Sequence, residues 1–241
     1  MRTNYTLARL YIDAPLTGTL ELGAERAHYL ARVLRLREGS RVRVFNGRDG
    51  EWAAELVGVG KRSARLEVRE RLREPYAPPE LAVFFAPLKR HRTAVVMEKS
   101  TELGATRLCP VITERTQFPK MDVGKMRAQV VEAAEQTERL DLPEVREARG
   151  LWEALESWEH PVLMGDEAGG VPVVSEAVRG MATPLAVLTG PEGGWTPEER
   201  ERLRGMERVV PVSLGPRILR ADTAVVAMLS VVQASVGDWV D

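Results

Sequence analysis

Apolar and polar positions alternate with a period of two in the first third of the chain. The alternation runs through residues 41–45, 51–57 and 64–68, and residues 46–50 between the first two segments are rich in the turn formers Asn, Gly and Asp. Within this third, helical spacing is confined to residues 24–36. The pattern predicts a compact barrel of short strands with one helix, formed by residues 1–72.

A proline-rich segment, residues 73–79, follows the predicted barrel. Because proline interrupts both helices and sheets, we expect an extended linker there. Beyond it, short apolar segments alternate with amphipathic ones, which is typical of a parallel α/β sheet, so residues 80–241 are predicted to form an α/β domain. The expected strands are residues 81–85, 108–112, 161–164, 185–188 and 209–212, and the expected helices are residues 92–103, 123–139, 197–203 and 221–236.

The composition is that of a globular protein, with 44% hydrophobic and 29% charged residues in 241. No apolar run approaches the roughly 18 residues of a membrane span, and residues 1–6 contain no apolar leader, so we expect a cytoplasmic protein. The single cysteine, Cys109, excludes an intrachain disulfide. With only three histidines beside it, no zinc-ligand pattern exists, and no metal is expected.

Charge is divided unevenly along the chain, although the net charge is only −1. Residues 1–75 carry 15 Lys and Arg against 10 Asp and Glu, so the remainder is acidic. Five arginines fall within twelve residues of the predicted barrel, at Arg32, Arg35, Arg37, Arg41 and Arg43. This density indicates contacts with nucleic-acid phosphates, and a plain solvated face is the alternative.

Three loops rich in glycine each follow a predicted strand, at residues 165–170, 189–194 and 213–220. Ligands of open α/β sheets bind outside the carboxyl ends of the strands, so the loops are candidates for one pocket, although any one of them alone is explained by turn formation. Leu214, Ile218 and Leu219 favour a pocket wall for a flat apolar group. Residues 190–194 are not a nucleotide phosphate loop, because no Gly-Lys-Ser/Thr follows. Residues 196–199 read instead as a helix start with a capping box.

Two helical segments have unusual faces. Residues 221–236 are apolar nearly all round, which indicates burial either in the core of the chain or at a subunit interface. Glu132, Glu135, Gln136 and Arg139 have the spacing of one polar helix face, for which a surface salt-bridge ladder is the usual explanation.

Taken together, the motifs resemble one known family, the uracil-N3 methyltransferases of 16S ribosomal RNA, which are the E-type small-subunit methyltransferases of the SPOUT superfamily. The resemblance covers almost the whole chain. It is carried by residues 28–39 (HYLARVLRLREG), 98–104 (EKSTELG), 114–115 (ER), 132–139 (EAAEQTER), 190–194 (GPEGG) and 214–224 (LGPRILRADTA). One departure is visible: Ala221 and Asp222 stand where the family usually has Thr and Glu, which puts in doubt any role that needs a longer carboxylate at 222.

The resemblance implies an α/β protein with two domains, an N-terminal PUA-like RNA-binding β-barrel and a C-terminal SPOUT domain with a deep trefoil knot. It also implies a homodimer, S-adenosyl-L-methionine as cofactor, and a uridine in the decoding region of 16S ribosomal RNA in the 30S subunit as the target. The three glycine-rich loops correspond to the family's cofactor loops. The implied cofactor-binding residues are Leu163, Gly165, Thr189, Gly190, Glu192, Gly193, Val212, Leu214, Gly215, Ile218, Leu219 and Thr223.

The chemistry of N3 methylation suggests roles for three further residues. Because N3 of uridine carries a proton at neutral pH, the reaction needs a positioned cation or base. Arg220, beside the third loop, is the candidate that stabilises the uracil anion, and Glu102 and Asp222 are both candidates for the base. Contacts with RNA are expected from Arg115 and Arg139 in addition to the five arginines of the barrel.

Three other functions remain compatible with the sequence. They are a non-catalytic RNA-binding or ribosome-assembly factor on the same fold, a SPOUT methyltransferase with another RNA target, and an unrelated small-molecule α/β enzyme. The complete glycine-rich loops disfavour the first, and the basic N-terminal third disfavours the last.

Overall fold

The computed structural model describes residues 7–60 and 62–240, so the expectation based on the first six residues lies outside it. The chain divides into two compact units. The first contains residues 1–77 and, from much later in the sequence, Ala134–Leu142. The second contains Pro78–Ala133 and Pro143–Asp241. This division differs from the predicted boundaries of 1–72 and 80–241 because residues 134–142 belong to the first unit.

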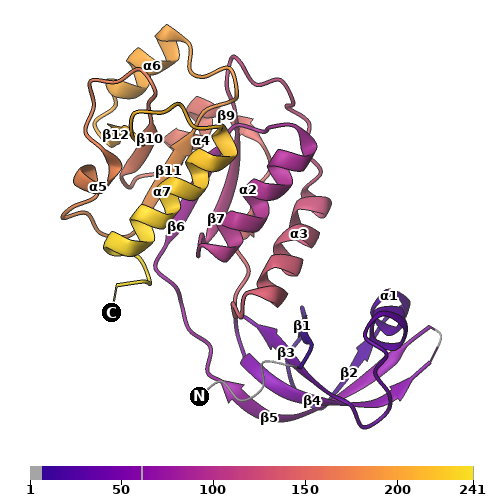
Figure 1. Cartoon of the computed structure of the whole chain (residues 1–241). Coiled ribbons are helices and arrows are strands. Elements are labelled where there is room, and N and C mark those ends of the chain that lie inside the picture. Colours follow the sequence, from indigo (N-terminus) through magenta and orange to yellow (C-terminus); the bar gives the residue numbers. More distant parts are fainter. Residues whose placement is uncertain (1–6, 61, 241) are drawn as a thin grey trace. The chain divides into compact units, whose positions relative to one another are not determined.

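The first unit is built on a five-stranded sheet with the order β1-β3-β4-β5-β2 (Figure 1). β1 and β3 run parallel, and the other neighbours are antiparallel. Alternate residues such as Val42 and Val44 are fully buried in its core, as the period-two pattern predicted. The strands are β1 (Arg9–Tyr11), β2 (Thr19–Leu22), β3 (Arg41–Asn46), β4 (Gly50–Val59) and β5 (Ala64–Arg73).

The helix expected at residues 24–36 is shorter than predicted. α1 (Ala24–His28) passes into a single π-helical turn, Tyr29–Val33, and the backbone then turns at Arg35, whose φ is +56°. A side chain rarely occupies this left-handed region, and a helix cannot continue through it. Arg35 and Arg37 therefore lie on an irregular segment rather than on the helix.

The second unit contains a parallel sheet of seven strands, which confirms the predicted α/β class. The order is β12-β10-β11-β6-β7-β8, and β9 also pairs with β7. The strands are β6 (Leu81–Phe85), β7 (Arg107–Ile112), β8 (Glu144–Val145), β9 (Arg149–Gly150), β10 (Val162–Gly165), β11 (Leu185–Thr189) and β12 (Val209–Val212). The deep knot stays a prediction.

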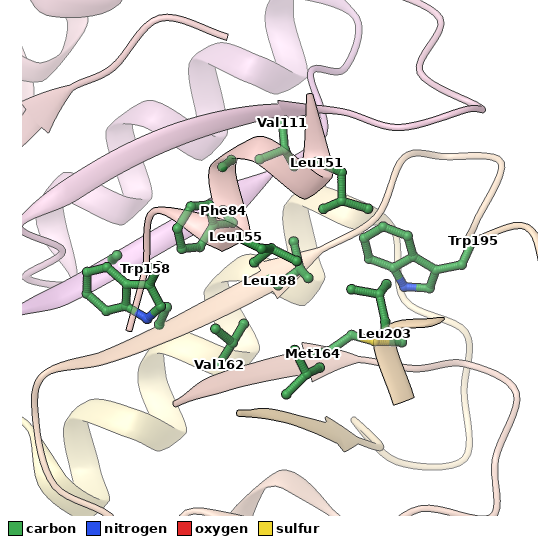
Figure 2. Close-up of a cluster of buried hydrophobic side chains, with 14 residues drawn as sticks. Phe84, Val111, Leu151, Leu155, Trp158, Val162, Met164, Leu188, Trp195 and Leu203 are labelled. Carbon is green, nitrogen blue, oxygen red and sulfur yellow. The ribbon is translucent and has the colours of Figure 1, made fainter. Parts of the chain in front are cut away.

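Helices surround this sheet and complete its core. One face, with Phe84 and Leu188, packs against Leu155 of α4 and Leu203 of α6, together with Trp195 (Figure 2). On the other side α7 packs against β11 and beside α2. The helices are α2 (Arg90–Glu102), α3 (Val123–Gln136), α4 (Leu151–Glu156), α5 (Val174–Ala177), α6 (Pro197–Arg204) and α7 (Ala221–Val236).

α2 and α7 run in the same direction. Arg92 at the start of α2 is bound to Asp222 at the start of α7, and the Gln233 amide near the end of α7 donates to the Leu103 carbonyl just beyond α2. α7 buries only one face, because Val226 and Val231 on either side of that face are half-exposed in the single chain. Of the two alternatives that the sequence left open, burial in the core of the chain therefore accounts for only one face of the helix, and burial at a subunit interface stays a prediction.

α3 ends three residues earlier than predicted, at Gln136. Glu138 has a φ of +63°, which is incompatible with a continued helix. The expected polar face that joined Glu132, Glu135, Gln136 and Arg139 therefore does not include Arg139.

Candidate active site

A cavity of about 690 Å³ lies at the carboxyl edge of the parallel sheet. The loops that follow β10, β11 and β12 line it, and these three strands are neighbours in the sheet. The size is in the range of small-molecule and cofactor sites. The predicted grouping of the three loops around one pocket is thus what the structure contains.

Most of the residues predicted to bind the cofactor line this cavity, namely Gly165, Thr189, Gly190, Glu192, Gly193, Leu214, Gly215, Ile218 and Leu219. Leu163, Val212 and Thr223 do not. Leu163 and Val212 are fully buried in β10 and β12, and Thr223 is exposed on α7 outside the cavity. The structure places these side chains, and their role in cofactor binding stays a prediction.

The buried Trp195 contacts two of the loops that line the cavity. The Trp195 indole nitrogen donates to the Gly165 carbonyl at 3.0 Å, which ties the end of β10 to the loop after β11. A Cβ at Gly190 would lie 3.0 Å from the Trp195 ring. Packing against Trp195 therefore accounts for glycine at 190. Gly215 differs, because it has a φ of +102° and open space beside it.

The segment Glu114–Arg115 braces the second loop. The predicted capping box is confirmed, since Thr196 Oγ1 accepts from the Glu199 amide and the Glu199 carboxylate accepts from the Thr196 amide, both at 3.1 Å. The same carboxylate accepts from the Glu114 amide at 2.8 Å. Arg115 Nη1 donates to the carbonyls of Gly193 at 2.9 Å and Trp195 at 3.2 Å. Arg115, predicted as an RNA contact, thus supports the pocket loop.

The first loop is fastened to α6 by a buried carboxylate that the sequence motifs did not reveal. Asp166 pairs with Arg200 at 3.2 Å and with Arg204 at 2.7 Å, and its Oδ1 accepts from the Ala168 amide. A signal for it did exist in the sequence, namely the four-residue spacing of Arg200 in the expected helix and Arg204 directly after it, with an acid in the loop that follows the expected strand at 161–164.

Charged residues meet at the edge of the cavity where α7 begins. Arg220 lines the cavity, is exposed, and has no side-chain hydrogen bond or ion pair with any residue that the structure describes. Asp222 instead binds Arg92, whose Nη1 lies 3.0 Å from Oδ2. Arg92 Nε also lies 3.3 Å from the Glu192 carboxylate. An Arg220–Asp222 ion pair, which would have made Arg220 a structural residue, is therefore not what the structure contains.

Glu102 is remote from this cavity in its own chain. It lies at the end of α2 and pairs with Lys99 at 2.8 Å. The contact between α2 and α7 runs from Asp222, near the cavity, to Gln233, beside the end of α2. The eleven residues of helix between them span about 16 Å, which separates Glu102 from the cavity end of α2. Glu102 therefore does not line the pocket of its own chain, and its role as the base stays a prediction. Asp222 is near the cavity but does not line it, and its carboxylate is held by Arg92.

The single thiol has no role at the site. Burial raises the pKa of Cys109 on β7 to about 11, so the thiol stays protonated and unreactive at neutral pH. Within the described part of the chain, no group of three or more His, Cys, Asp and Glu side chains is placed to hold a metal ion. No helix in that part is long and apolar enough to cross a membrane.

The arginines that were predicted to contact RNA differ in the exposure of their side chains. Arg32, Arg35, Arg37 and Arg41 are exposed on the first unit. Arg43 is buried, because its guanidinium binds both oxygens of Glu138 at 2.6 and 2.7 Å. The prediction of Arg43 as a phosphate contact is therefore wrong.

Arg139 is also withdrawn from solvent. Its guanidinium binds both oxygens of Asp141 at 3.0 and 2.7 Å, and its side chain is only 9% exposed. The prediction that Arg139 contacts RNA does not fit this geometry.

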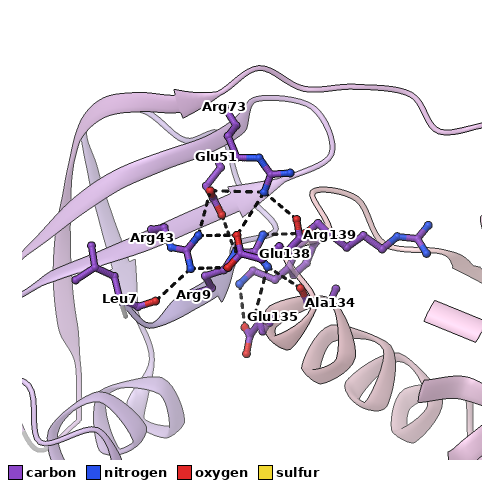
Figure 3. A network of polar contacts seen from close by, with 10 residues as sticks. Leu7, Arg9, Arg43, Glu51, Arg73, Ala134, Glu135, Glu138 and Arg139 are labelled. Carbon is purple, nitrogen blue, oxygen red and sulfur yellow. Dashed lines mark hydrogen bonds and ion pairs between the residues drawn. The ribbon is translucent and has the colours of Figure 1, made fainter. Parts of the chain in front are cut away.

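A buried charge cluster, defined by Arg9, Arg43, Glu51 and Glu138 together with the exposed Arg73, holds residues 134–142 to the sheet of the first unit (Figure 3). Arg9 Nε donates to Glu51 at 2.6 Å, and both side chains are nearly inaccessible. Its other nitrogens donate to the carbonyls of Ala134 at 2.7 Å and Arg139 at 2.9 Å. Burial alone would raise the pKa of Glu138. The hydrogen bond from Arg43 and the charges of the arginines outweigh burial and hold that pKa below its usual value.

Comparison with known proteins identifies the family. Residues 75–233 match the family described as RNA methyltransferase domain, and residues 22–69 match the RNA methyltransferase PUA domain. A ribosomal RNA small subunit methyltransferase E from Rickettsia conorii is 32% identical over 162 residues, which are 66% of this chain and 66% of that protein. Its counterpart from Synechocystis is 36% identical over 149 residues, 59% of this chain and 48% of that protein. The aligned region thus spans less than two thirds of these two relatives.

Two solved structures match over nearly their full lengths. A protein from Legionella pneumophila in complex with S-adenosylmethionine has a TM-score of 0.86 and 32% identity, with 96% of this chain and 99% of that chain covered. The ribosomal RNA small subunit methyltransferase E from Neisseria gonorrhoeae, bound to S-adenosylmethionine, has a TM-score of 0.84 and 26% identity, with 97% and 99% covered. Together with the two domain matches, these findings confirm the family that the motifs predicted: the chain belongs to the RNA methyltransferase family, with a PUA-like domain before the methyltransferase domain.

Proposed function

We propose that the protein transfers the methyl group of S-adenosyl-L-methionine to N3 of a uridine in the decoding region of 16S ribosomal RNA. The observation that carries the proposal is the cavity of about 690 Å³ with a guanidinium, Arg220, that has no counter-ion among the described residues. Relatives named for small-subunit ribosomal RNA methylation, and similar structures with bound S-adenosylmethionine, support the same activity. Because the substrate is ribosomal, we place the reaction in the cytoplasm.

The cavity fits the cofactor in size and chemistry. Leu214, Ile218 and Leu219 give it an apolar wall, and exposed loop backbone beside Gly215 leaves space for close approach. When bound, the cofactor supplies an electrophilic methyl group on a positively charged sulfur. Ile218 tests this fit, because it is 84% exposed and its replacement does not disturb the core, unlike replacement of Gly190 above Trp195. Ile218→Asp should weaken cofactor binding in calorimetry, and the same change at exposed Val33 should not.

Arg220 supplies the group that the chemistry needs. Loss of the N3 proton leaves negative charge on the uracil ring, and a preorganised cation beside the ring stabilises that charge in the transition state. Neither carboxylate considered as the base lines the cavity. We therefore infer that Arg220 lowers the pKa of N3 enough for solvent at the open cavity to take the proton.

The RNA-binding role of the first unit is supported by the exposed arginines at 32, 35, 37 and 41. None of the four guanidinium groups has a side-chain partner among the described residues, so all are available to phosphates. A homodimer is supported by α7, because Val226 and Val231, on either side of its buried face, stay partly exposed in the single chain and a second copy would cover them. Light scattering at low micromolar concentration should give about twice the chain mass of 26.8 kDa.

Mass spectrometry of ribosomal RNA tests the function directly. The protein is incubated with S-adenosylmethionine and either 30S subunits or naked 16S RNA from a strain that lacks the modification. We expect one methylated uridine, at N3, in one of the two substrates. Methylation of another RNA would identify a related methyltransferase with a different target, and absence of methylation despite cofactor binding would contradict the proposal.

A further inference from the structure

One arginine outside all the sequence motifs binds two carboxylates beside the cavity. Arg92 lies in the first turn of α2, which follows β6, and the carboxyl end of β6 pairs with that of β11. This position brings its guanidinium to Asp222 of α7 and to Glu192 of the loop after β11.

We propose that Arg92 is a positioning residue that occupies Asp222 and Glu192 and thereby keeps Arg220 unpaired for the substrate. The inference deepens the proposed function and rests on it. Arg92 itself does not line the cavity, so it acts through Arg220 rather than on the reacting atoms.

The geometry of Arg92 suits this task. Nη1 lies 3.0 and 3.2 Å from the two Asp222 oxygens, and Nε lies 3.3 Å from the Glu192 carboxylate. The side chains of Arg92 and Asp222 are each only 16% exposed, so their attraction is less screened than that of a surface pair. One guanidinium can serve two carboxylates because its donors are spread around a rigid plane, which a lysine ammonium cannot match.

Without Arg92, the two acids would compete for Arg220. Glu192 and Arg220 line the same cavity, and Asp222 follows Arg220 by only two residues. An exposed arginine is long and flexible enough to turn toward a freed carboxylate. Such a pair would neutralise the guanidinium and direct it away from the uracil, so the cation needed in the transition state would be lost.

A double-mutant cycle between Arg92 and Arg220 tests the proposal in the full-length protein. Arg92→Ala should lower the single-turnover methylation rate by about tenfold or more, and Arg92→Lys should restore it only in part. In the Arg220→Ala background the Arg92→Ala change should have little further effect, because its target is already missing. Additive losses in the cycle would show that Arg92 does not act through Arg220 and would overturn the proposal.

A second part of the experiment removes the charge of Asp222, one of the two carboxylates that would compete for Arg220. Asp222→Asn added to Arg92→Ala should recover part of the lost rate, because the neutral amide cannot form an ion pair with Arg220. The proposal would also be overturned if the double variant recovered no rate and Asp222→Asn alone abolished methylation. Those two results would mean that the reaction depends on Asp222 itself. Arg107→Ala is the matched control, since it removes an arginine paired with Glu80 at the opposite, amino edge of the sheet.

Two binding measurements separate this inference from other roles of Arg92. The affinities for S-adenosylmethionine and for RNA should each change no more than a few-fold in Arg92→Ala. A loss of RNA affinity equal to the loss in rate would make Arg92 an RNA contact and would contradict the proposal.

An NMR measurement needs no activity at all. The Nε–H signal of Arg220 should exchange rapidly with solvent in the wild type and slow down in Arg92→Ala as a new ion pair forms. If the wild type methylates no RNA but this exchange slows, the proposed function fails while the pairing holds. An unchanged exchange rate overturns the pairing.

Discussion

Arg220 and Arg92 are the same residue type, and they differ in their partners. Arg92 is saturated by two carboxylates, whereas Arg220 has no counter-ion among the described residues and faces a cavity. An unpaired cation there contributes little to stability. Under the proposed function, it provides a preorganised charge for the uracil anion that forms only during the reaction.

Arg220→Ala should therefore impair catalysis more than binding. We expect the single-turnover methylation rate to fall roughly 10²-fold, comparable with the loss of one oxyanion donor, while the dissociation constant of S-adenosylmethionine changes only a few-fold. Arg217→Ala is the control, because Arg217 is another exposed arginine that lines the cavity from the same loop. If cofactor binding collapsed in parallel with the rate, Arg220 would belong to the architecture of the pocket.

Arg115 shows the opposite case, an arginine whose hydrogen bonds support a loop. Arg115→Ala removes the donor to the carbonyls of Gly193 and Trp195. We expect a loss of about 1–2 kcal/mol of stability and weaker cofactor binding. Hydrogen exchange should report faster exchange at the Gly194 and Trp195 amides. RNA binding should keep its salt dependence, and a salt slope reduced by the value of one phosphate ion pair would identify Arg115 as a phosphate ligand instead.

At the scale of elements, periodicity alone predicted the main strands and helices. β6, β12 and α7 have the predicted bounds, because their residues are apolar almost throughout and the ends of these apolar runs are clear. β1, β2, α4 and α5 were missed, since each mixes polar and apolar residues over only three to six positions, which is too few to establish a period. Two backbone reversals, at Arg35 and Glu138, ended predicted helices early, and no glycine marked either one.

The sequence also did not indicate which residues are buried by segments that lie far away along the chain. Arg41 and Arg43 point to the same side of β3, and one is exposed while the other is buried. The difference comes from residues 134–142, which are almost a hundred positions away along the chain. The glycine-rich loops were predictable because they follow strands directly, whereas Arg92 and Asp166 acquire their roles only through packing.

The exposed arginines of the irregular segment after α1 and of the start of β3 give a prediction for RNA binding. Replacement of Arg35, Arg37 and Arg41 by alanine should weaken RNA binding and reduce its salt slope by about 0.7 to 0.9 for each arginine–phosphate ion pair that the change removes. The triple change of the exposed Arg65, Arg69 and Arg71 on β5 removes the same charge from another strand of the unit. Equal effects of the two triple variants would indicate general electrostatic attraction rather than specific binding by this segment.

At the scale of the whole molecule, the buried charge cluster links stability to pH. Because the pKa of Glu138 is lower in the folded chain than its usual value of 4.5, this carboxyl stabilises the fold above that pH. Its contribution is lost as the pH falls from there through the lowered pKa. Glu138→Gln should lower the free energy of unfolding by about 1–3 kcal/mol at pH 7. It should also make that free energy fall less steeply as the pH is lowered.

Urea unfolding at several pH values between 7 and 3 measures this effect. Glu55→Gln is the comparison, because Glu55 pairs with Arg69 in an exposed position and should contribute little. A free energy of unfolding that falls as steeply with pH in Glu138→Gln as in the wild type would mean that other carboxyls control the transition.

The position of residues 134–142 also limits how this protein can be divided. A fragment of residues 1–79 lacks the carbonyls that Arg9 binds and the carboxylate that Arg43 binds, so two buried cations would share Glu51 alone. We expect that fragment to show little native circular dichroism, and a peptide of residues 134–142 to restore part of it. A unit that completes its fold only with a segment from far downstream cannot be exchanged between genes as one continuous piece. Recombination that separates residues 1–77 from residues 134–142 is therefore expected to leave the first unit incomplete.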